Sequence, residues 1–247
     1  MKKEGNSFGK IFCSSFMILI FEFVGTVVLT VFQRMTSGVV FLFAFWWIFA
    51  LFHNLTGSHF NPAVTITCML RRDKGKFNWP LGFAYIIVQF IGAFCGALLA
   101  FMWTQTGGNI VIVNIKYSFQ AILSEIFASF LFIFMFLIQT EEKTRFSQDK
   151  AIWSFIVAAT YGTCLAFNEN VSGSLNPAFG LAVHLTMLMD HGHHFLKYSW
   201  IFIVFPFVGG IVALIVHEFI YKKTQDMVDD EYEVRRESMM AINTSDP

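Results

Sequence analysis

Two asparagines, each followed by proline and alanine, are the residues of this chain best suited to bind small polar molecules. Two tripeptides that interrupt otherwise apolar sequence carry them, Asn61-Pro62-Ala63 and Asn176-Pro177-Ala178. Proline is favoured at the first position of a helix, and asparagine is a good N-cap directly before it. The sequence therefore predicts that a helix begins at each motif, with an asparagine amide at its N-terminus.

Two glutamates inside long apolar runs are the other candidates for chemistry. Glu22 precedes Thr26 by four residues, and Glu125 precedes Ser129 by the same spacing. Ionisable groups at membrane depth are costly and usually face the interior of a helix bundle. A proton relay and a structural role both stay open at this point.

Other classes of site have little support. We find no nucleophile–base pair and no phosphate-binding loop, so the sequence predicts neither an enzyme nor a bound cofactor. The segment Asp190–His194 contains three histidines, but its short spacing and its glycine favour a solvated turn over a metal site. The net charge is zero, which leaves a nucleic-acid partner without electrostatic support.

The composition places these residues in a membrane. Hydrophobic residues make up 55% of the 247 residues and charged residues 14%, against about 25% in soluble domains. Two short apolar segments, 62–70 and 177–189, cannot cross about 30 Å of hydrocarbon, so we expect re-entrant half-helices there. Six longer runs predict membrane spans at 11–33, 36–53, 81–103, 119–140, 151–168 and 198–221.

The chain also divides into two similar halves, about 11–105 and 117–222, within a channel domain at 11–222. Each half has three spans, a glutamate in its first span and one Asn-Pro-Ala motif. Because three is odd, the halves must insert in opposite directions. Such an inverted repeat places a functional site near the bilayer midplane.

The distribution of Lys and Arg predicts the orientation of the chain. Only Arg34, Lys116 and Lys197 fall on one side. Because cytoplasmic segments are enriched in these residues, residues 1–10 and the tail 223–247 are expected in the cytoplasm, the tail as a disordered segment. A kinase-like pattern precedes Ser238 in that tail. The other basic residues are Lys2, Lys3, Lys10, Arg71, Arg72, Lys74, Lys76, Lys143, Arg145, Lys150, Lys222, Lys223, Arg235 and Arg236.

These motifs resemble those of the aquaporin, or major intrinsic protein, family. The resemblance implies an all-α fold of six spans and two half-helices, assembled as a homotetramer in a plasma or intracellular membrane. It also implies that Asn61 and Asn176 face the pore and that Glu22 and Glu125 brace the re-entrant loops. The similar segments are Gly57–Thr65, Gly173–Ala178, Gln89–Ala93 and Pro206–Gly210.

The chain departs from this family at a second constriction. The family pattern places the constriction at Phe41, Cys164, Gly173 and Phe179 here. Its usual arginine is replaced by Phe179, and no Lys or Arg occurs between Lys150 and Lys197. Two outcomes stay open: small residues widen the site, or Phe41 and Phe179 stack across it and narrow it.

The sequence therefore predicts a passive channel for water, with small neutral solutes such as glycerol, urea or ammonia as further permeants. Gly180 and Phe202 favour the water-conducting branch of the family over the glycerol-conducting branch. Three alternatives remain: a facilitator mainly for neutral solutes, a non-conducting structural or junctional membrane protein, and a weak cation conductor.

Overall fold

The computed structural model describes residues 4–72, 78–107, 117–171 and 173–245, which form helices and no strands. Six helices are long and apolar enough to cross a membrane. This confirms the predicted six-span all-α membrane fold, with span edges shifted by a few residues. The six are α1 (Glu4–Met35), α2 (Gly38–Thr56), α4 (Trp79–Thr104), α5 (Ser118–Thr140), α6 (Lys150–Phe167) and α8 (Ser199–Val216).

Two shorter helices begin at the Asn-Pro-Ala motifs. They are α3 (Pro62–Met69) and α7 (Pro177–His191). Asn61 and Asn176 are their N-caps, and each has an extended backbone conformation. The remaining short elements are the 3-10 helices η2 (Glu169–Val171) and η3 (His193–Tyr198) and the π-helix η4 (His217–Tyr221).

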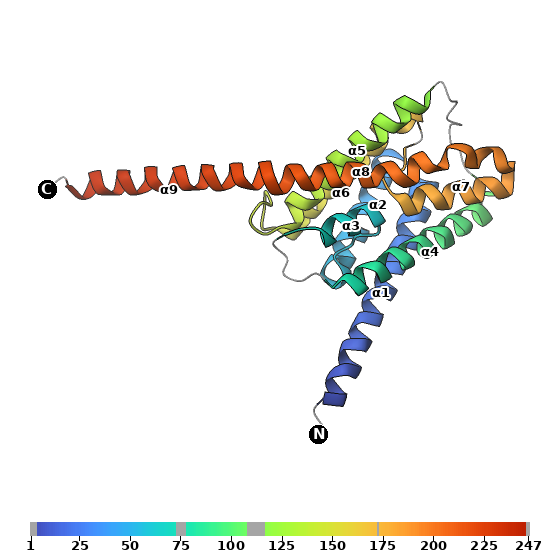
Figure 1. The fold of residues 1–247 in the computed structure, drawn as a ribbon, viewed down its shortest axis with the longest axis horizontal. Coiled ribbons are helices and arrows are strands. Elements are labelled where there is room, and N and C mark those ends of the chain that lie inside the picture. Colours follow the sequence, from blue (N-terminus) through green and yellow to red (C-terminus); the bar gives the residue numbers. More distant parts are fainter. Residues whose placement is uncertain (1–3, 73–77, 108–116, 172, 246–247) are drawn as a thin grey trace.

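The two halves of the chain pack in corresponding ways. In the first half α1 lies along α4, and in the second half α5 lies along α8 (Figure 1). Each short helix also packs on the last long helix of the other half, α3 on α8 and α7 on α4. Exchanging the halves therefore exchanges corresponding helix pairs.

Glycines allow the long helices to approach closely within each half. A Cβ on Gly96 of α4 would lie 2.6 Å from the carbonyl oxygen of Val27 on α1. A Cβ on Gly209 of α8 would lie 2.5 Å from the carbonyl oxygen of Ile126 on α5. Both distances are shorter than a carbon–oxygen contact allows, so these crossings require a residue without a side chain.

An aromatic cluster ties α2, α5 and α6 together. The ring of Tyr161 lies 4.6 Å from Phe132, 4.8 Å from Phe45 and 5.8 Å from Phe41, between ring centroids. Tyr161 is 1% exposed, and its hydroxyl donates to Gln33 Oε1 of α1 at 3.0 Å. The cluster thereby fixes the wall on one side of the bundle.

Large apolar side chains also cover the outward faces of the bundle. A water-soluble monomer rarely exposes so much contiguous apolar surface, whereas a membrane-spanning bundle must present it to lipid. Examples from five different spanning helices are Phe16, Phe43, Ile87, Phe119 and Trp200.

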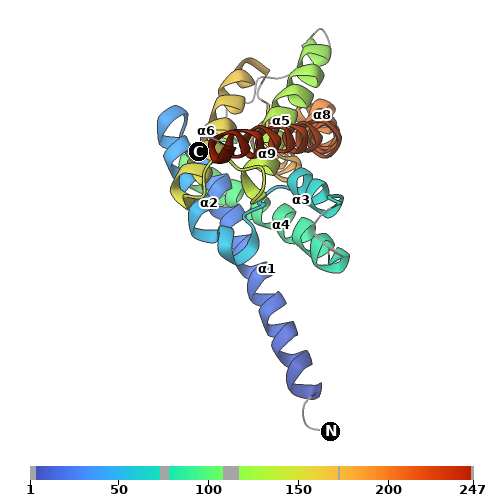
Figure 2. The ribbon, with the colours of Figure 1, turned by 90° about the vertical axis from the view of Figure 1, so that its left-hand side faces the viewer.

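The C-terminal tail corrects one prediction. Residues 223–247 were expected to be disordered, but Lys222–Ser245 form a long helix, α9, which continues from η4 and projects from the bundle (Figures 1 and 2). This stretch lacks glycine and proline, and Arg235 Nη2 pairs with Glu231 Oε1 at 2.6 Å across one turn. Its charge suggested disorder, but the spacing of that charge supports a helix.

The first helix is longer than its membrane-spanning part. Helix α1 begins at Glu4 and continues without a break to Met35 (Figure 2), whereas its apolar span is Ser15–Met35, within a few residues of the predicted span at 11–33. The basic residues Lys2, Lys3, Lys74, Lys76 and Lys116, which the orientation argument uses, lie outside the described residues.

Candidate functional site

Asn61 and Asn176 lie where the two short helices meet. Asn61 Nδ2 donates to the carbonyl oxygen of Leu175, and Asn176 Nδ2 donates to that of Phe60, both at 2.8 Å. Each asparagine therefore binds the loop that leads into the other short helix. Both side chains are 2% exposed, so this reciprocal pair lies in the protein interior.

The side-chain oxygens of the same asparagines cap their own helices. Asn61 Oδ1 accepts from Ala63 N at 2.8 Å, and Asn176 Oδ1 accepts from Ala178 N at 3.0 Å. An amide has two N–H donors, and the contact with the opposite loop uses one of them. Each asparagine thus keeps one N–H for a further acceptor, beside a helix N-terminus that carries about +0.5 charge.

Buried glutamates hold the residue that precedes each asparagine. Phe60 and Leu175 adopt left-handed backbone conformations, with φ of 48° and 56°, which is uncommon for residues with a Cβ. Phe60 N donates to Glu22 Oε1 at 2.5 Å, and Leu175 N donates to Glu125 Oε1 at 2.6 Å. The two loops therefore have the same carboxylate contact at the same position.

Further donors fix the two carboxylates. Gln89 Nε2 donates to Glu22 Oε1 at 2.8 Å. Ser174 Oγ donates to Glu125 Oε1 at 2.8 Å, and Asn168 Nδ2 donates to Glu125 Oε2 at 3.2 Å. Both glutamates are fully buried, so these protein donors take the place of water at both oxygens of Glu125 and at Oε1 of Glu22, whereas Oε2 of Glu22 has no recorded hydrogen-bond partner among the described residues.

A cavity of about 560 Å³ opens at the end of the bundle where α1 ends and α2 begins. We call it the mouth cavity. Its walls come from α1, α2, α4, α6 and α7 and from the segments that follow α4 and α6. They include Arg34, Phe41, Glu169, Gly173 and Phe179.

The structure brings three of the four predicted filter residues to this cavity: Phe41, Gly173 and Phe179. Cys164 is not among the lining residues. It is 3% exposed and lies in the hydrophobic core with the aromatic cluster. Its position in the sequence placed it on the right helix, but the rotation of α6 turns its side chain into the packed interior.

Phe41 packs its ring against other aromatic rings and not against Phe179. Its ring lies parallel to Phe45 at 6.2 Å and tilted to Tyr161 at 5.8 Å, between centroids, and it is 3% exposed. The described residues include no ring contact between Phe41 and Phe179. The ring of Phe41 therefore belongs to the wall of the mouth cavity rather than to a plug across it.

Arg34 is the residue at this site that sequence reasoning missed. It lies in the last turn of α1 and lines the same cavity as Phe179. Arg34 is distant in sequence from the second motif, whose surroundings between Lys150 and Lys197 contain no Lys or Arg. The available clue was that Arg34 is one of only three Lys or Arg residues that the sequence places on its side of the predicted bundle.

Comparison with known proteins assigns the family. A model of the family described as major intrinsic protein matches residues 10–217, which is most of the chain. The chain belongs to this family. Its members are passive channels for water or small solutes, so this protein is a multi-pass membrane channel and not an enzyme.

Individual relatives agree with this assignment. An uncharacterized aquaporin-like protein of Haemophilus influenzae is 29% identical over 188 residues, which cover 69% of this chain and 85% of that protein. The probable aquaporin PIP2-8 of Arabidopsis thaliana is 33% identical over 181 residues, 68% of this chain and 62% of the plant protein. The matched region thus spans less than two thirds of the plant relative.

A solved structure shares the fold of this major intrinsic protein. The aquaglyceroporin from Plasmodium falciparum superposes with a TM-score of 0.69 at 18% sequence identity. The match covers 86% of this chain and 99% of that one. At this identity the comparison supports the architecture of the helices and nothing finer.

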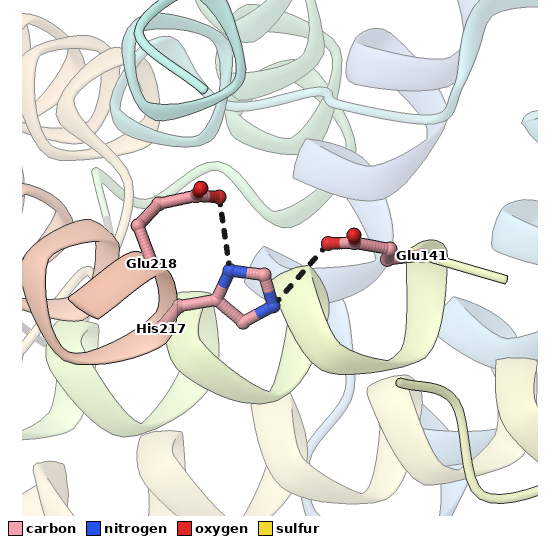
Figure 3. Close-up of side chains that lie close together, drawn as sticks. All are labelled: Glu141, His217 and Glu218. Carbon is pink, nitrogen blue, oxygen red and sulfur yellow. Dashed lines mark hydrogen bonds and ion pairs between the residues drawn. The ribbon is translucent and has the colours of Figure 1, made fainter. Parts of the chain in front are cut away.

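A second polar cluster lies at the opposite end of this major intrinsic protein, near the start of α9 (Figure 3). His217 Nδ1 lies 3.3 Å from Glu218 Oε1, and His217 Nε2 lies 3.5 Å from Glu141 Oε2. Arg71 also pairs with Glu141, and Lys222 Nζ lies 3.1 Å from Glu141 Oε1. Because the carboxylates face opposite nitrogens of one imidazole and already pair with cations, we assign no metal site here.

The histidine-rich segment contributes little further. The rings of His193 and His194 lie 4.3 Å apart between centroids, and both side chains are exposed. The side chain of His191 lies outside the described residues.

Proposed function

We propose that this chain is a passive channel that conducts water in single file between Asn61 and Asn176. The observation that carries the proposal is the reciprocal contact of each asparagine with the opposite loop, at 2.8 Å on both sides. This contact fixes both amides while leaving each one N–H donor. A water molecule between them accepts from both amides at one point along the path.

The same geometry supports exclusion of protons. A water whose oxygen accepts from both asparagines directs its hydrogens away from the midplane, which breaks a continuous hydrogen-bonded chain along the file. The N-termini of α3 and α7 add partial positive charge at this point. Cations are therefore repelled at the midplane, in addition to any repulsion by charged residues at the mouth cavity.

Small neutral solutes are the second candidate permeants, and the wall of the mouth cavity favours them. Phe41 and Phe179 present apolar rings there, and Gly38, Gly162 and Gly173 leave space beside them. The carbon skeleton of a solute such as glycerol packs better against these rings than against a charged side chain at the same position. We therefore propose water as the main permeant and small neutral solutes as additional ones.

Stopped-flow swelling of proteoliposomes tests this proposal. Osmotic water flow, glycerol uptake and proton leak are measured on one preparation of the purified full chain. We expect water flow well above that of empty liposomes, a smaller glycerol flux and no added proton leak. Swelling equal to that of empty liposomes would contradict the proposal and favour a non-conducting structural protein.

The remaining features of the channel are also proposals. We propose that Glu22 and Glu125 brace the re-entrant loops, because they bind the backbone of Phe60 and Leu175. We propose that both termini are cytoplasmic, since Arg71, Arg145 and Lys222 lie together at the end from which α9 leaves. The mouth cavity then faces the outer side, and four such chains form a homotetramer with one pore each.

A further inference from the structure

The wall of the mouth cavity includes a basic side chain, Arg34, although Phe179 occupies the position where the family usually has arginine. Arg34 comes from the end of α1, far in sequence from Phe179, yet both line this cavity. Among the described lining residues, only Arg34 and Glu169 carry charge. The charges on the described wall of the entrance therefore come from two residues outside the second Asn-Pro-Ala motif, and the carboxylate of Asp190 lies behind the segment that binds Arg34.

Backbone carbonyls hold the guanidinium of Arg34 in place. Its Nη2 donates to the carbonyl oxygen of Gly107 at 2.5 Å and to that of Thr106 at 3.4 Å. Gly107 N in turn donates to Asp190 Oδ2 at 2.6 Å, so the end of α7 anchors the segment that binds Arg34. Carbonyl groups are neutral, so they orient the guanidinium and leave its positive charge in place. A carboxylate in direct contact would neutralise that charge.

Arg34 also retains hydrogen-bonding capacity. Its Nε is buried and has no hydrogen-bond partner among the described residues. A guanidinium carries five N–H donors, and the two recorded contacts involve only Nη2. Because Nε is buried, the donors of Arg34 that can reach a polar molecule beside the apolar rings are those of the terminal nitrogens, chiefly Nη1, which has no recorded contact among the described residues.

We infer that Arg34 determines the specificity of the entrance: its fixed charge repels metal cations and hydronium, and its free donors receive neutral hydrogen-bond acceptors. This inference rests on the proposed channel function. It places the fixed cation on the first helix of the bundle instead of at Phe179. It also predicts that Glu169, the other charged lining residue, acts on cations with the opposite sign.

Charge-changing variants of the full chain in proteoliposomes test the inference. Arg34→Gln should raise potassium and proton leak about 3- to 10-fold, the range for one unit charge acting at the edge of a partly solvated cavity. Arg34→Lys keeps the charge and should stay within about twofold of wild type. Glu169→Gln should lower any residual cation leak, and it leaves the Arg34 carbonyl contacts intact.

Further variants separate electrostatics from structure. Arg235→Gln, on the exposed face of α9, removes an equal charge away from the cavity and should change nothing. With Phe179→Arg already present, Arg34→Gln should have little further effect, because the entrance then has a second cation. The Arg235→Gln control should also retain wild-type water flow within about twofold.

The outcomes distinguish the two proposals. Normal water flow with unchanged cation leak in Arg34→Gln would overturn the inference alone. Equal effects of Arg34→Gln and Arg34→Lys, with unchanged leak in Glu169→Gln, would show that Arg34 only positions the Gly107 segment, which also overturns it. Absence of water flow in wild type would overturn the proposed function and the inference with it.

Discussion

At the scale of single residues, the carboxylate of Glu125 shows how one side chain shapes a loop at membrane depth. It accepts hydrogen bonds from the backbone of Ser174 and Leu175 and from the side chain of Asn168. Leu175 needs this support because its backbone is left-handed. The carbonyl of the same Leu175 accepts a hydrogen bond from Asn61, so Glu125 acts on Asn61 through the loop.

Replacing Glu125 should therefore lower the stability of the fold by an amount that depends on how many acceptor oxygens the new side chain keeps. Glu125→Ala leaves at least three buried donors without a partner, at about 1–3 kcal/mol each, whereas Glu125→Gln retains one acceptor oxygen. We expect a large drop in the thermal unfolding temperature of purified protein for alanine and a smaller drop for glutamine. Glu142→Ala, at an exposed carboxylate, is the control. Wild-type stability of Glu125→Ala would show that the carboxylate does not brace the loop.

The amino-acid sequence predicts the positions of some residues of this site and not of others. The capping role of Asn61 and Asn176 could be predicted, because helix capping depends only on neighbouring residues and the tripeptide Asn-Pro-Ala contains all of them. Arg34 could not be assigned to the cavity, because its position there depends on where α1 ends relative to α7. The orientation of Cys164 depends on the rotation of α6, which the aromatic contacts of Tyr161 set.

At the scale of elements, the crossing of α1 and α4 sets the position of Glu22 in the bundle. The carbonyl of Val27 lies so close to Gly96 that the two backbones are nearly in contact. Any side chain at this position separates the helices. A shift of α1 then moves both Glu22 and the entrance residue Arg34.

Gly96→Ala should consequently destabilise the fold by about 1–3 kcal/mol, the usual cost of overpacking. Gly162→Ala is a matched control on a helix of the same bundle, because its Cβ would lie 3.7 Å from the nearest atom, an ordinary contact. Thermal unfolding of both variants in detergent measures the difference. Equal stability of the two would contradict the close crossing.

Truncation tests the role of α9. The helix projects from the bundle, and its described contacts with the rest of the chain include the exposed pair Lys143–Asp226 at 2.5 Å. Removing residues 224–247 should lower the helix content measured by circular dichroism while leaving water flow within about twofold. A loss of water flow would show that the tail is part of the conducting unit.

The same elements show what sequence patterns can predict. The six spans follow from long apolar runs, and the starts of α3 and α7 follow from proline at the first helical position. The helical state of α9 was missed because a charged, polar composition suggested disorder, although pairs such as Glu231 and Arg235 have helical spacing. For this segment the amino-acid composition predicted disorder and the spacing of opposite charges predicted a helix, and the structure has a helix.

At the scale of the whole molecule, the two halves combine into a single site where the short helices meet. Each half supplies one capped short helix, one buried glutamate and one close helix crossing. Neither half forms the asparagine pair alone, since each asparagine binds a carbonyl of the other half. The outward apolar faces then place this shared interior at the depth of the bilayer.

The most direct test of this account is the osmotic water flow of proteoliposomes that contain Asn176→Leu. Leucine is similar in size but removes the donor to Phe60 and the cap of α7, so we predict at least a tenfold loss of water flow. Asn54→Leu, at an exposed asparagine on α2, should conduct like wild type. Wild-type water flow in correctly folded Asn176→Leu would contradict conduction between the two asparagines.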